Sequence, residues 1–533
     1  MLFNSYSFIF IFLPITLLLY YFVNFSGYKK HQYKLLILII ASFFFYGYWN
    51  PKYLILISIS ILFNFFIGKE INKNKNYKLK KIILFLGVTF NLLLLIYFKY
   101  SNFFIENLEN VFRVSISWKE VILPIAISFF TFQQIAYLVD VYFNKTKEHK
   151  ILNYALFVSF FPQLIAGPIV YHKEMRKQLI DKKIAEKIFN NLSLGISIFA
   201  LGLFKKVIIA DSLESFASPL FESVELGNTL TLIEAWGAMF AFTFQIYFDF
   251  SGYSDMAIGL ARLFGFKLPY NFNSPYLATN VVDFWKRWHI TLSRFIRDYL
   301  YIKLKEKLSN FSKKKRMGNL SHFLFSFFPL IIAFTLSGLW HGAAWNFFLW
   351  GCLHSFYIII NRIWKIIRKE LGINQIKNNL YKISCIFITF ISVSFAFVLF
   401  RSTTLEVALS IYESLLPAKT ILLPSELIGK WENFLTPYLK LIPLFNFKFE
   451  GNFIINVKEF VEGSIFIIIS FFIVWFFKNS NSFVKIENNK LIFPQLIKYK
   501  INSLGVFIVY FIFLYSLILM INTKIIPYVY FQF

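Results

Sequence analysis

The chain has 533 residues, of which 57% are hydrophobic and 21% aromatic, and its mean hydropathy is +0.59. These values lie far above those of soluble domains, so they exclude an ordinary water-soluble fold and predict an integral membrane protein. The net charge of +27 does not by itself indicate a nucleic-acid-binding protein, because the basic residues fall in short loops between apolar segments.

Apolar segments of about 20 residues, the length that crosses a bilayer as a helix, recur along the whole chain. They lie near 7–24, 33–49, 52–67, 82–103, 121–142, 187–210, 229–249, 322–340, 343–361, 383–400, 463–477 and 505–523. Two further segments, 151–170 and 251–265, contain prolines or glycines, which predicts re-entrant or discontinuous helices. The expected fold class is an all-α polytopic membrane protein that forms one domain over residues 1–533.

Charge in the loops predicts how the chain is oriented in a cell membrane, which we expect to be the inner, cytoplasmic one. Lysines and arginines gather near 69–81, 173–183, 303–316, 362–382 and 478–500, and such loops mark the cytoplasmic side. Residues 211–228 carry acidic residues but no lysine or arginine, so we place them outside. If the segments 151–170 and 251–265 both enter and leave by the cytoplasmic face, alternating sides puts the insertion 401–462 at the extracytoplasmic face, where it is a candidate contact for a partner protein.

His341 lies in the apolar stretch SGLWHGAAWN at 337–346. An ionisable group at membrane depth costs a few kcal/mol or more, so it is a candidate functional residue. An imidazole can also accept and return a proton near neutral pH. The alternative is a neutral histidine that is hydrogen-bonded to a neighbouring helix.

A second candidate, His289, lies in the segment 279–303. Apolar residues recur there at steps of three and four, which predicts a single amphipathic helix at the cytoplasmic interface: Trp285, Trp288, Leu292, Phe295, Tyr299 and Ile302. On this evidence alone, a polar residue facing the interface explains His289 as well as a catalytic role does.

Four ordered motifs resemble those of the membrane-bound O-acyltransferases, in particular the bacterial branch typified by alginate O-acetyltransferase and its peptidoglycan and teichoic-acid relatives. They are FPQLIAGPIV at 161–170, YFDFSGYSDMAIG at 247–259, NFNSPYLATNVVDFWKRWHITLSRFIRDYLY at 271–301 and SGLWHGAAWNFFLWG at 337–351. The resemblance implies a ring of roughly a dozen helices and re-entrant segments around a central tunnel. It places His341 and His289 at the narrow point of that tunnel.

The resemblance also implies an activity, which is transfer of an acyl group, expected to be acetyl, from a cytoplasmic thioester donor across the membrane. Acetyl-CoA is the expected donor, and an extracytoplasmic polysaccharide such as an alginate-like polymer or peptidoglycan is the expected acceptor, reached directly or through a transferase-like or esterase-like partner. His341 is implied as the base that removes the alcohol proton, and His289 as the residue that orients the donor carbonyl or stabilises the oxyanion. No metal or bound cofactor is expected.

The chain ends in PYVYFQF, which resembles tails of the same branch and makes Tyr530 a candidate acyl carrier. A tyrosine oxygen can hold a covalent intermediate, which would split the transfer into two shorter steps. The alternative is that Tyr528 and Tyr530 anchor the chain in the outer membrane interface.

Three other functions remain open at this point. D-alanyl transfer from a carrier protein to teichoic acid would also suit the basic cytoplasmic face. Broken helices and buried polar groups also describe transporters, so a glycan exporter is a second alternative. A non-catalytic scaffold is the third.

Overall fold

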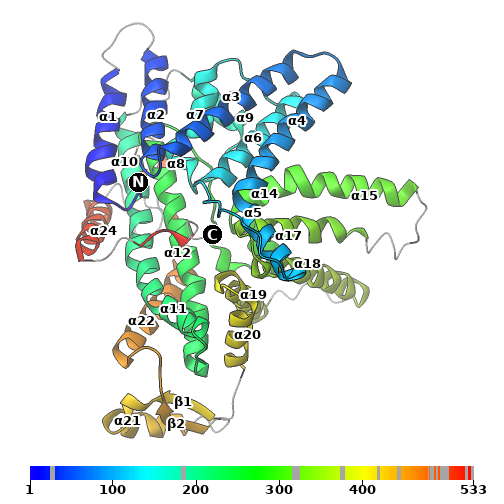
Figure 1. Ribbon diagram of the computed structural model, residues 1–533. Helices are drawn as coiled ribbons and strands as arrows, with labels where there is room; N and C mark the ends of the chain where they lie inside the picture. The colour runs from blue at the N-terminus through cyan, green and yellow to red at the C-terminus, as the bar shows by residue number, and fades with distance from the viewer. Residues whose placement is uncertain are drawn as a thin grey trace.

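The computed structural model describes residues 1–23, 30–181, 188–314, 318, 325–372, 378–416, 420–440, 446–477, 479–480, 485–487, 490–492, 503–522 and 526–529. Within these residues nearly all of the regular structure is helical, and most helices pack side by side (Figure 1). The predicted all-α membrane fold is therefore confirmed.

The helices of the first half of the chain are η1 (Ser7–Phe12), α1 (Leu13–Phe22), α2 (Lys30–Gly47), α3 (Lys52–Lys73), α4 (Tyr77–Leu95), η3 (Ile96–Tyr100), α5 (Ser101–Phe112), α6 (Ile127–Tyr142), α7 (Ile151–Ser159), α8 (Phe161–Leu164), α9 (His172–Ile180), α10 (Ile188–Phe204), η4 (Lys205–Ala210), α11 (Asp211–Glu225) and α12 (Leu232–Leu263). Those of the second half are η5 (Pro275–Leu277), α13 (Val281–Arg287), α14 (Ile290–Ile296), η6 (Arg297–Tyr301), α15 (Ile302–Lys314), α17 (Phe328–His341), α18 (Trp345–Glu370), α19 (Asn379–Arg401), α20 (Leu405–Ser414), η7 (Ser425–Leu427), α21 (Lys430–Leu439), α22 (Val457–Phe476) and α24 (Ser503–Asn522).

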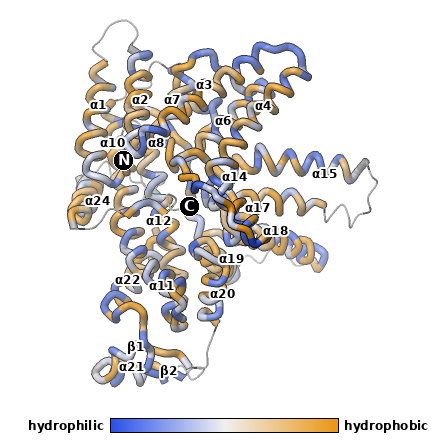
Figure 2. Tube along the Cα trace, viewed as in Figure 1, coloured by the Kyte–Doolittle hydropathy of each residue, from blue (hydrophilic) through white to orange (hydrophobic). Residues whose placement is uncertain are grey.

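Helices lie at all of the predicted spans. Among the described residues, five helical stretches are long and apolar enough to cross a bilayer: Lys52–Lys73, Tyr77–Phe112, Ile188–Glu225, Asn379–Arg401 and Val457–Phe476. Shorter apolar helices occupy Ser7–Phe22, His31–Gly47, Phe328–His341 and Phe507–Ile521. Figure 2 shows the apolar residues along these helices and hydrophilic residues where α3 meets α4 and along α15.

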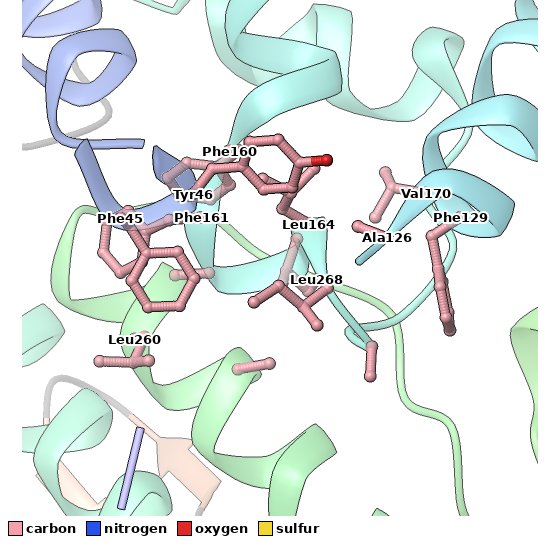
Figure 3. Packing of buried hydrophobic residues seen from close by; sticks show 14 of the residues in the cluster. Phe45, Tyr46, Ala126, Phe129, Phe160, Phe161, Leu164, Val170, Leu260 and Leu268 are labelled. Carbon is pink, nitrogen blue, oxygen red and sulfur yellow. The ribbon is translucent and has the colours of Figure 1, made fainter. Parts of the chain in front are cut away.

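Aromatic side chains from distant parts of the sequence form the core near the N-terminus. Phe161 of α8 packs against Phe45 of α2, with ring centroids 5.6 Å apart, and against Phe264, which follows α12, at 5.8 Å. Leu164 and Leu260 lie in the same cluster (Figure 3). This packing ties the short helix α8 to the centre of the molecule.

The two segments predicted to be broken behave differently. The segment 151–170 is interrupted at Phe160, and Pro162 lies in the first turn of α8, where a missing N–H costs nothing. The second expectation is wrong, because 251–263 belongs to the uninterrupted 32-residue helix α12. Gly252 and Gly259 serve packing instead.

Both glycines let α10 approach α12 closely. A Cβ atom at Gly252 would lie 2.8 Å from the carbonyl oxygen of Gly202, and one at Gly259 would lie 2.7 Å from that of Gly195. Small residues at matching positions of two helices allow such backbone contact in membrane proteins. The glycines thus join two long helices rather than ending one.

The insertion 401–462 contains α20, α21 and two short strands, β1 (Thr420–Pro424) and β2 (Asn446–Gly451), which pair in parallel. A second, antiparallel pair consists of β3 (Lys485–Glu487) and β4 (Lys490–Ile492). The β1–β2 pair and α21 lie at the end of the molecule opposite the α3–α4 connection (Figure 1). Glu234 at the start of α12 accepts a 2.6 Å hydrogen bond from the N–H of Ile454, which fixes the insertion to the helical body.

Candidate functional site

The helix predicted over 279–303 is interrupted at His289. The structure has α13 ending at Arg287 and α14 beginning at Ile290, and His289 between them adopts a left-handed conformation with φ of 41°. Such a conformation is uncommon for a residue other than glycine and is frequent at functional sites. The predicted continuous interface helix is therefore wrong at this point.

Tertiary hydrogen bonds hold the turn at His289. The carbonyl oxygen of Asn271 accepts from the N–H of Ile290 at 2.9 Å, and its side-chain oxygen accepts from the Thr291 hydroxyl at 2.6 Å. The same hydroxyl oxygen accepts from the N–H of Ile169 at 3.0 Å. Two other segments, at Asn271 and Ile169, thus fix the main chain around His289, whose side chain is 0% exposed. The interface-facing explanation for His289 is excluded by this burial.

His341 is the last residue of α17, a helix of 14 residues. At 1.5 Å per residue, α17 is about 21 Å long and too short to cross a hydrocarbon layer of about 30 Å by itself. Close packing of α17 against α18 depends on Gly338, where a Cβ atom would lie 2.1 Å from the carbonyl oxygen of Phe347. The side chain of His341 is consequently held against α18 and is only 5% exposed.

Trp340 connects the two histidines. Its indole ring lies 6.2 Å from the imidazole of His289 and 4.9 Å from that of His341, measured between ring centroids. Trp350 and Phe400 approach the His341 ring at 5.3 and 5.2 Å. The structure thus brings both predicted histidines into one aromatic enclosure.

Two neighbours of His341 were missed at the sequence level. The Lys99 ammonium donates to the main-chain carbonyls of Trp340 and His341, and the Tyr100 hydroxyl donates to that of Leu339 at 3.0 Å. These are the last carbonyls of α17, which lack donors within the helix. A lysine within the predicted span 82–103 was the available signal, because charges at membrane depth are expensive.

A cavity of about 180 Å³ lies between α13–α14, α17 and α18, the helices that flank His289 and His341. Neither histidine is among the described residues that line it. Apolar side chains make up most of its wall, and polar groups lie at Ser293, Arg297, Tyr301, Ser337 and Arg362. Ser337, on its wall, lies one helical turn before His341 on α17. Its mainly apolar wall suits an extended apolar group.

Tyr530 lies outside the described residues, but the segment just before it is described. Lys206 of η4 makes ion pairs with Asp249 at 2.6 Å and Asp211 at 2.8 Å, and the other Asp249 oxygen accepts from the N–H of Val529 at 3.0 Å. Tyr528 packs on the Lys206 ammonium, with 4.8 Å between the nitrogen and the ring centroid. This short segment crosses α12 in Figure 1.

Tyr528 is 1% exposed, so the expectation that it anchors the chain in the membrane interface is wrong for this residue. Tyr528 packs instead against Tyr253, whose ring centroid is 4.8 Å away, and against the Lys206 cation. Neither contact is evident from the local sequence. Residue 529, directly before Tyr530, is thereby held inside the helical body.

Three other polar groups near the centre of the chain have partners within the protein. Asp255 pairs with Lys205 at 2.7 Å, the partly exposed Asp283 pairs with Arg287 at 3.1 Å, and His354 accepts a hydrogen bond from the Trp285 indole at 3.3 Å. In the part of the chain that the structure describes, no group of three or more His, Cys, Asp or Glu side chains could hold a metal ion.

Comparison with known proteins identifies the family of this chain. A model of the MBOAT, membrane-bound O-acyltransferase family, matches residues 43–402. A peptidoglycan O-acetyltransferase of Helicobacter pylori is 42% identical over 441 residues, covering 78% of this chain and 80% of the relative. A protein of Pseudomonas aeruginosa named probable alginate O-acetylase AlgI is 37% identical over 421 residues, covering 78% and 75%.

A teichoic acid D-alanyltransferase of Streptococcus thermophilus is similar over a shorter region, with 28% identity over 285 residues that cover 52% of this chain and 68% of the relative. The family match includes the four motifs at 161–170, 247–259, 271–301 and 337–351 that carried the resemblance. The chain therefore belongs to the membrane-bound O-acyltransferase family.

Proposed function

We propose that this protein is a membrane O-acetyltransferase that supplies acetyl groups for an extracytoplasmic polysaccharide. The observation that carries the proposal is the burial of His289 and His341 against the same indole ring, that of Trp340. The names of the Helicobacter and Pseudomonas relatives support acetyl as the group transferred and a polysaccharide as the acceptor. Peptidoglycan and an alginate-like polymer are the two acceptor classes that these names suggest.

His341 acts as the general base in this proposal. It removes the proton from a hydroxyl group, whose oxygen attacks the thioester carbonyl and forms a tetrahedral oxyanion. His289 donates a hydrogen bond to that oxyanion or orients the carbonyl before attack. When the carbon–sulfur bond breaks, His341 returns the proton to the thiolate, so that an ester and a free thiol leave the site.

The cavity beside Ser337 supports a thioester donor. An extended arm ending in an acetyl thioester would lie along its apolar wall, and Arg297 and Arg362 on the lining could contact anionic parts of such a donor. Acetyl-CoA has this combination of an extended arm and phosphate groups. The donor would approach from the face with the basic loops, which we assign to the cytoplasm.

Tyr530 is proposed as an acyl carrier between donor and acceptor. In the first step its hydroxyl oxygen takes the acetyl group from the thioester with His341 as base, and in the second an acceptor hydroxyl displaces the tyrosine oxygen. The hydrogen bond from the Val529 N–H to Asp249 supports this role, because it holds the residue directly before Tyr530 in the protein interior. The insertion 401–462 is the proposed contact for an extracytoplasmic partner that completes the transfer.

Membership in an acyltransferase family favours an enzyme over the exporter and scaffold alternatives. D-alanyl transfer to teichoic acid ranks behind acetyl transfer, because that relative is less similar and matches only about half of the chain. The proposed location is the inner membrane, with several membrane-spanning helices.

Mass spectrometry of surface polymers tests the proposal. Cells with and without the protein are compared for base-labile acetyl and D-alanyl esters on each exported glycan. We expect acetyl esters on one polysaccharide to disappear without the protein and to return with the intact gene. Unchanged acetyl content together with lost D-alanyl esters would replace acetyl by D-alanyl transfer, and unchanged esters of both kinds would overturn the proposal.

A further inference from the structure

A second cavity lies between the end of α3, the loop from α6 to α7 and the beginning of α9. Its volume is about 460 Å³, within the range of about 300–1,000 Å³ that small-molecule sites occupy. None of the described residues that line it is acidic, and its basic side chains are Lys145, Lys147, Lys173, Arg176 and Lys177.

Two buried carboxylates lie beneath this wall. Asp140 is 4.0 Å from the Lys145 ammonium and 3.9 Å from that of Lys173, and Glu148 is 3.9 Å from the Arg176 Nε. Charge-assisted hydrogen bonds are shorter, about 2.7–2.9 Å. The carboxylates therefore hold the cations in place electrostatically, while the N–H groups keep the capacity to bind an anion.

The wall of the cavity keeps a net positive charge, because its five basic side chains outnumber the two carboxylates of Asp140 and Glu148. Within the described part of the chain, neither Lys147 nor Lys177 forms an ion pair with a carboxylate. A concave surface lined by one sign of charge concentrates ions of the opposite sign. The chemistry of the wall thus selects an anion with several oxygen acceptors.

Aromatic side chains beside the cavity indicate where this anion comes from. The rings of Tyr77 and Tyr142 lie 5.9 Å apart, and the exposed ring of Phe143 is 5.8 Å from the Lys145 ammonium. Tyrosine and other aromatic residues occupy the boundary between lipid and water, and basic pockets between membrane helices on the cytoplasmic side bind anionic headgroups. A ligand with a phosphate head and an apolar tail fits both features.

We propose that this cavity binds phosphate groups, and that their source is the headgroup of an anionic phospholipid. The shared chemistry is a phosphate held by lysine and arginine; a soluble donor that carries phosphates, such as coenzyme A, is the other source. Neither His289 nor His341 is among the described residues that line this cavity, so the proposal stands or fails independently of acetyl transfer.

The test uses the full-length protein in phosphatidylcholine nanodiscs that contain an increasing fraction of phosphatidylglycerol. Native mass spectrometry counts the retained phosphatidylglycerol for wild type and for the double variant Lys147→Gln/Lys177→Gln, which leaves the ion pairs of Asp140 and Glu148 intact. The matched control is Lys305→Gln/Lys307→Gln, which removes the same charge from two exposed positions of α15. Calorimetry with coenzyme A, ADP and inorganic diphosphate, in phosphatidylcholine alone, forms the second arm.

We expect the double variant to bind phosphatidylglycerol about thirtyfold more weakly, from roughly 1 kcal/mol for each of the two basic residues near a membrane surface, and the control to bind as wild type. A similar loss confined to coenzyme A and ADP would keep the phosphate site and assign it to a soluble ligand. Equal binding of lipid, nucleotide and diphosphate by wild type and double variant would overturn the proposal.

Discussion

The Lys99 ammonium donates a hydrogen bond to the main-chain carbonyl of His341, with 3.0 Å between the nitrogen and the oxygen. The same ammonium also donates to the carbonyl of Trp340. A lysine from the first third of the chain thereby completes the end of the helix that carries the candidate base. This contact fixes α17 at the residue where its own hydrogen bonding stops.

Replacing Lys99 by methionine removes that donor while keeping a long, flexible side chain. We expect the free energy of unfolding to fall by about 1–3 kcal/mol, because two carbonyls lose their partner, and the rate of acyl transfer to fall as His341 shifts. Thermal unfolding and transfer rates of the purified protein measure both effects. The exposed Lys52→Met is the control, and a Lys99 variant that matches it in both measurements would refute the role.

Gly338→Ala tests the close approach of α17 and α18. The added methyl group would lie 2.1 Å from the Phe347 carbonyl oxygen, so the helices must separate. Overpacking of this kind typically costs about 1–3 kcal/mol, and the displaced His341 should lower the transfer rate as well. Gly318→Ala is the comparison, since nothing lies within 4 Å of a Cβ atom there. Equal unfolding temperatures for the two variants would argue against tight packing.

Lys206→Met should destabilise the protein by about 3–5 kcal/mol, because it leaves Asp249 and Asp211 without their shared cation. Lys205→Met should cost less, since the Lys205–Asp255 pair is more exposed. Chemical unfolding of the two variants compares them. Lys206→Met should also loosen the contact of residues 526–529 with Asp249 and Lys206, and so increase proteolysis of a tag placed after Phe533. An unchanged cleavage rate would show that other contacts hold these residues.

Glu148 gives a pH-dependent prediction. Burial alone raises the pKa of Glu148, but His172 and the backbone N–H groups of His149 and Lys150 outweigh burial and bring the pKa below the ordinary value of 4.5. The carboxylate therefore stabilises the folded protein above about pH 4.5, and this stabilisation disappears as the pH falls through the lower folded-state pKa.

At neutral pH, the free energy of unfolding of Glu148→Gln should accordingly be about 1–3 kcal/mol below that of wild type. The unfolding temperature should fall as well. The difference should shrink as the pH falls below about 4.5. Thermal unfolding over this range, with the exposed Glu306→Gln as control, makes the comparison. A stability difference that stays constant with pH would contradict the assignment of charge to Glu148.

Hydropathy and proline predicted much of the fold because both act locally. Runs of apolar residues located the helices, and Pro162 marked a real interruption at the start of α8. The interruption predicted from Gly252 and Gly259 was wrong, because glycine can either break a helix or let another helix approach it. Only the position of α10 decides between the two.

The site was predicted only in part, because some of its features depend on local sequence and others on distant contacts. His341 could be recognised from its apolar surroundings, whereas the turn at His289 is imposed by Asn271 and Thr291, and the apolar stripe of 279–303 runs through the break without a signal. The role of Lys99 depends on a contact with residues more than two hundred positions away. Such long-range contacts have no local counterpart in the sequence.

Acetyl transfer by His341→Ala, in purified protein reconstituted with an acetyl thioester donor and a glycan acceptor, tests the central claim most directly. We predict a rate about 10²–10⁴-fold below wild type, the usual contribution of a general base, with the unfolding temperature preserved and the exposed His149→Ala as active as wild type. A His341→Ala protein that forms the ester at the wild-type rate would contradict the account.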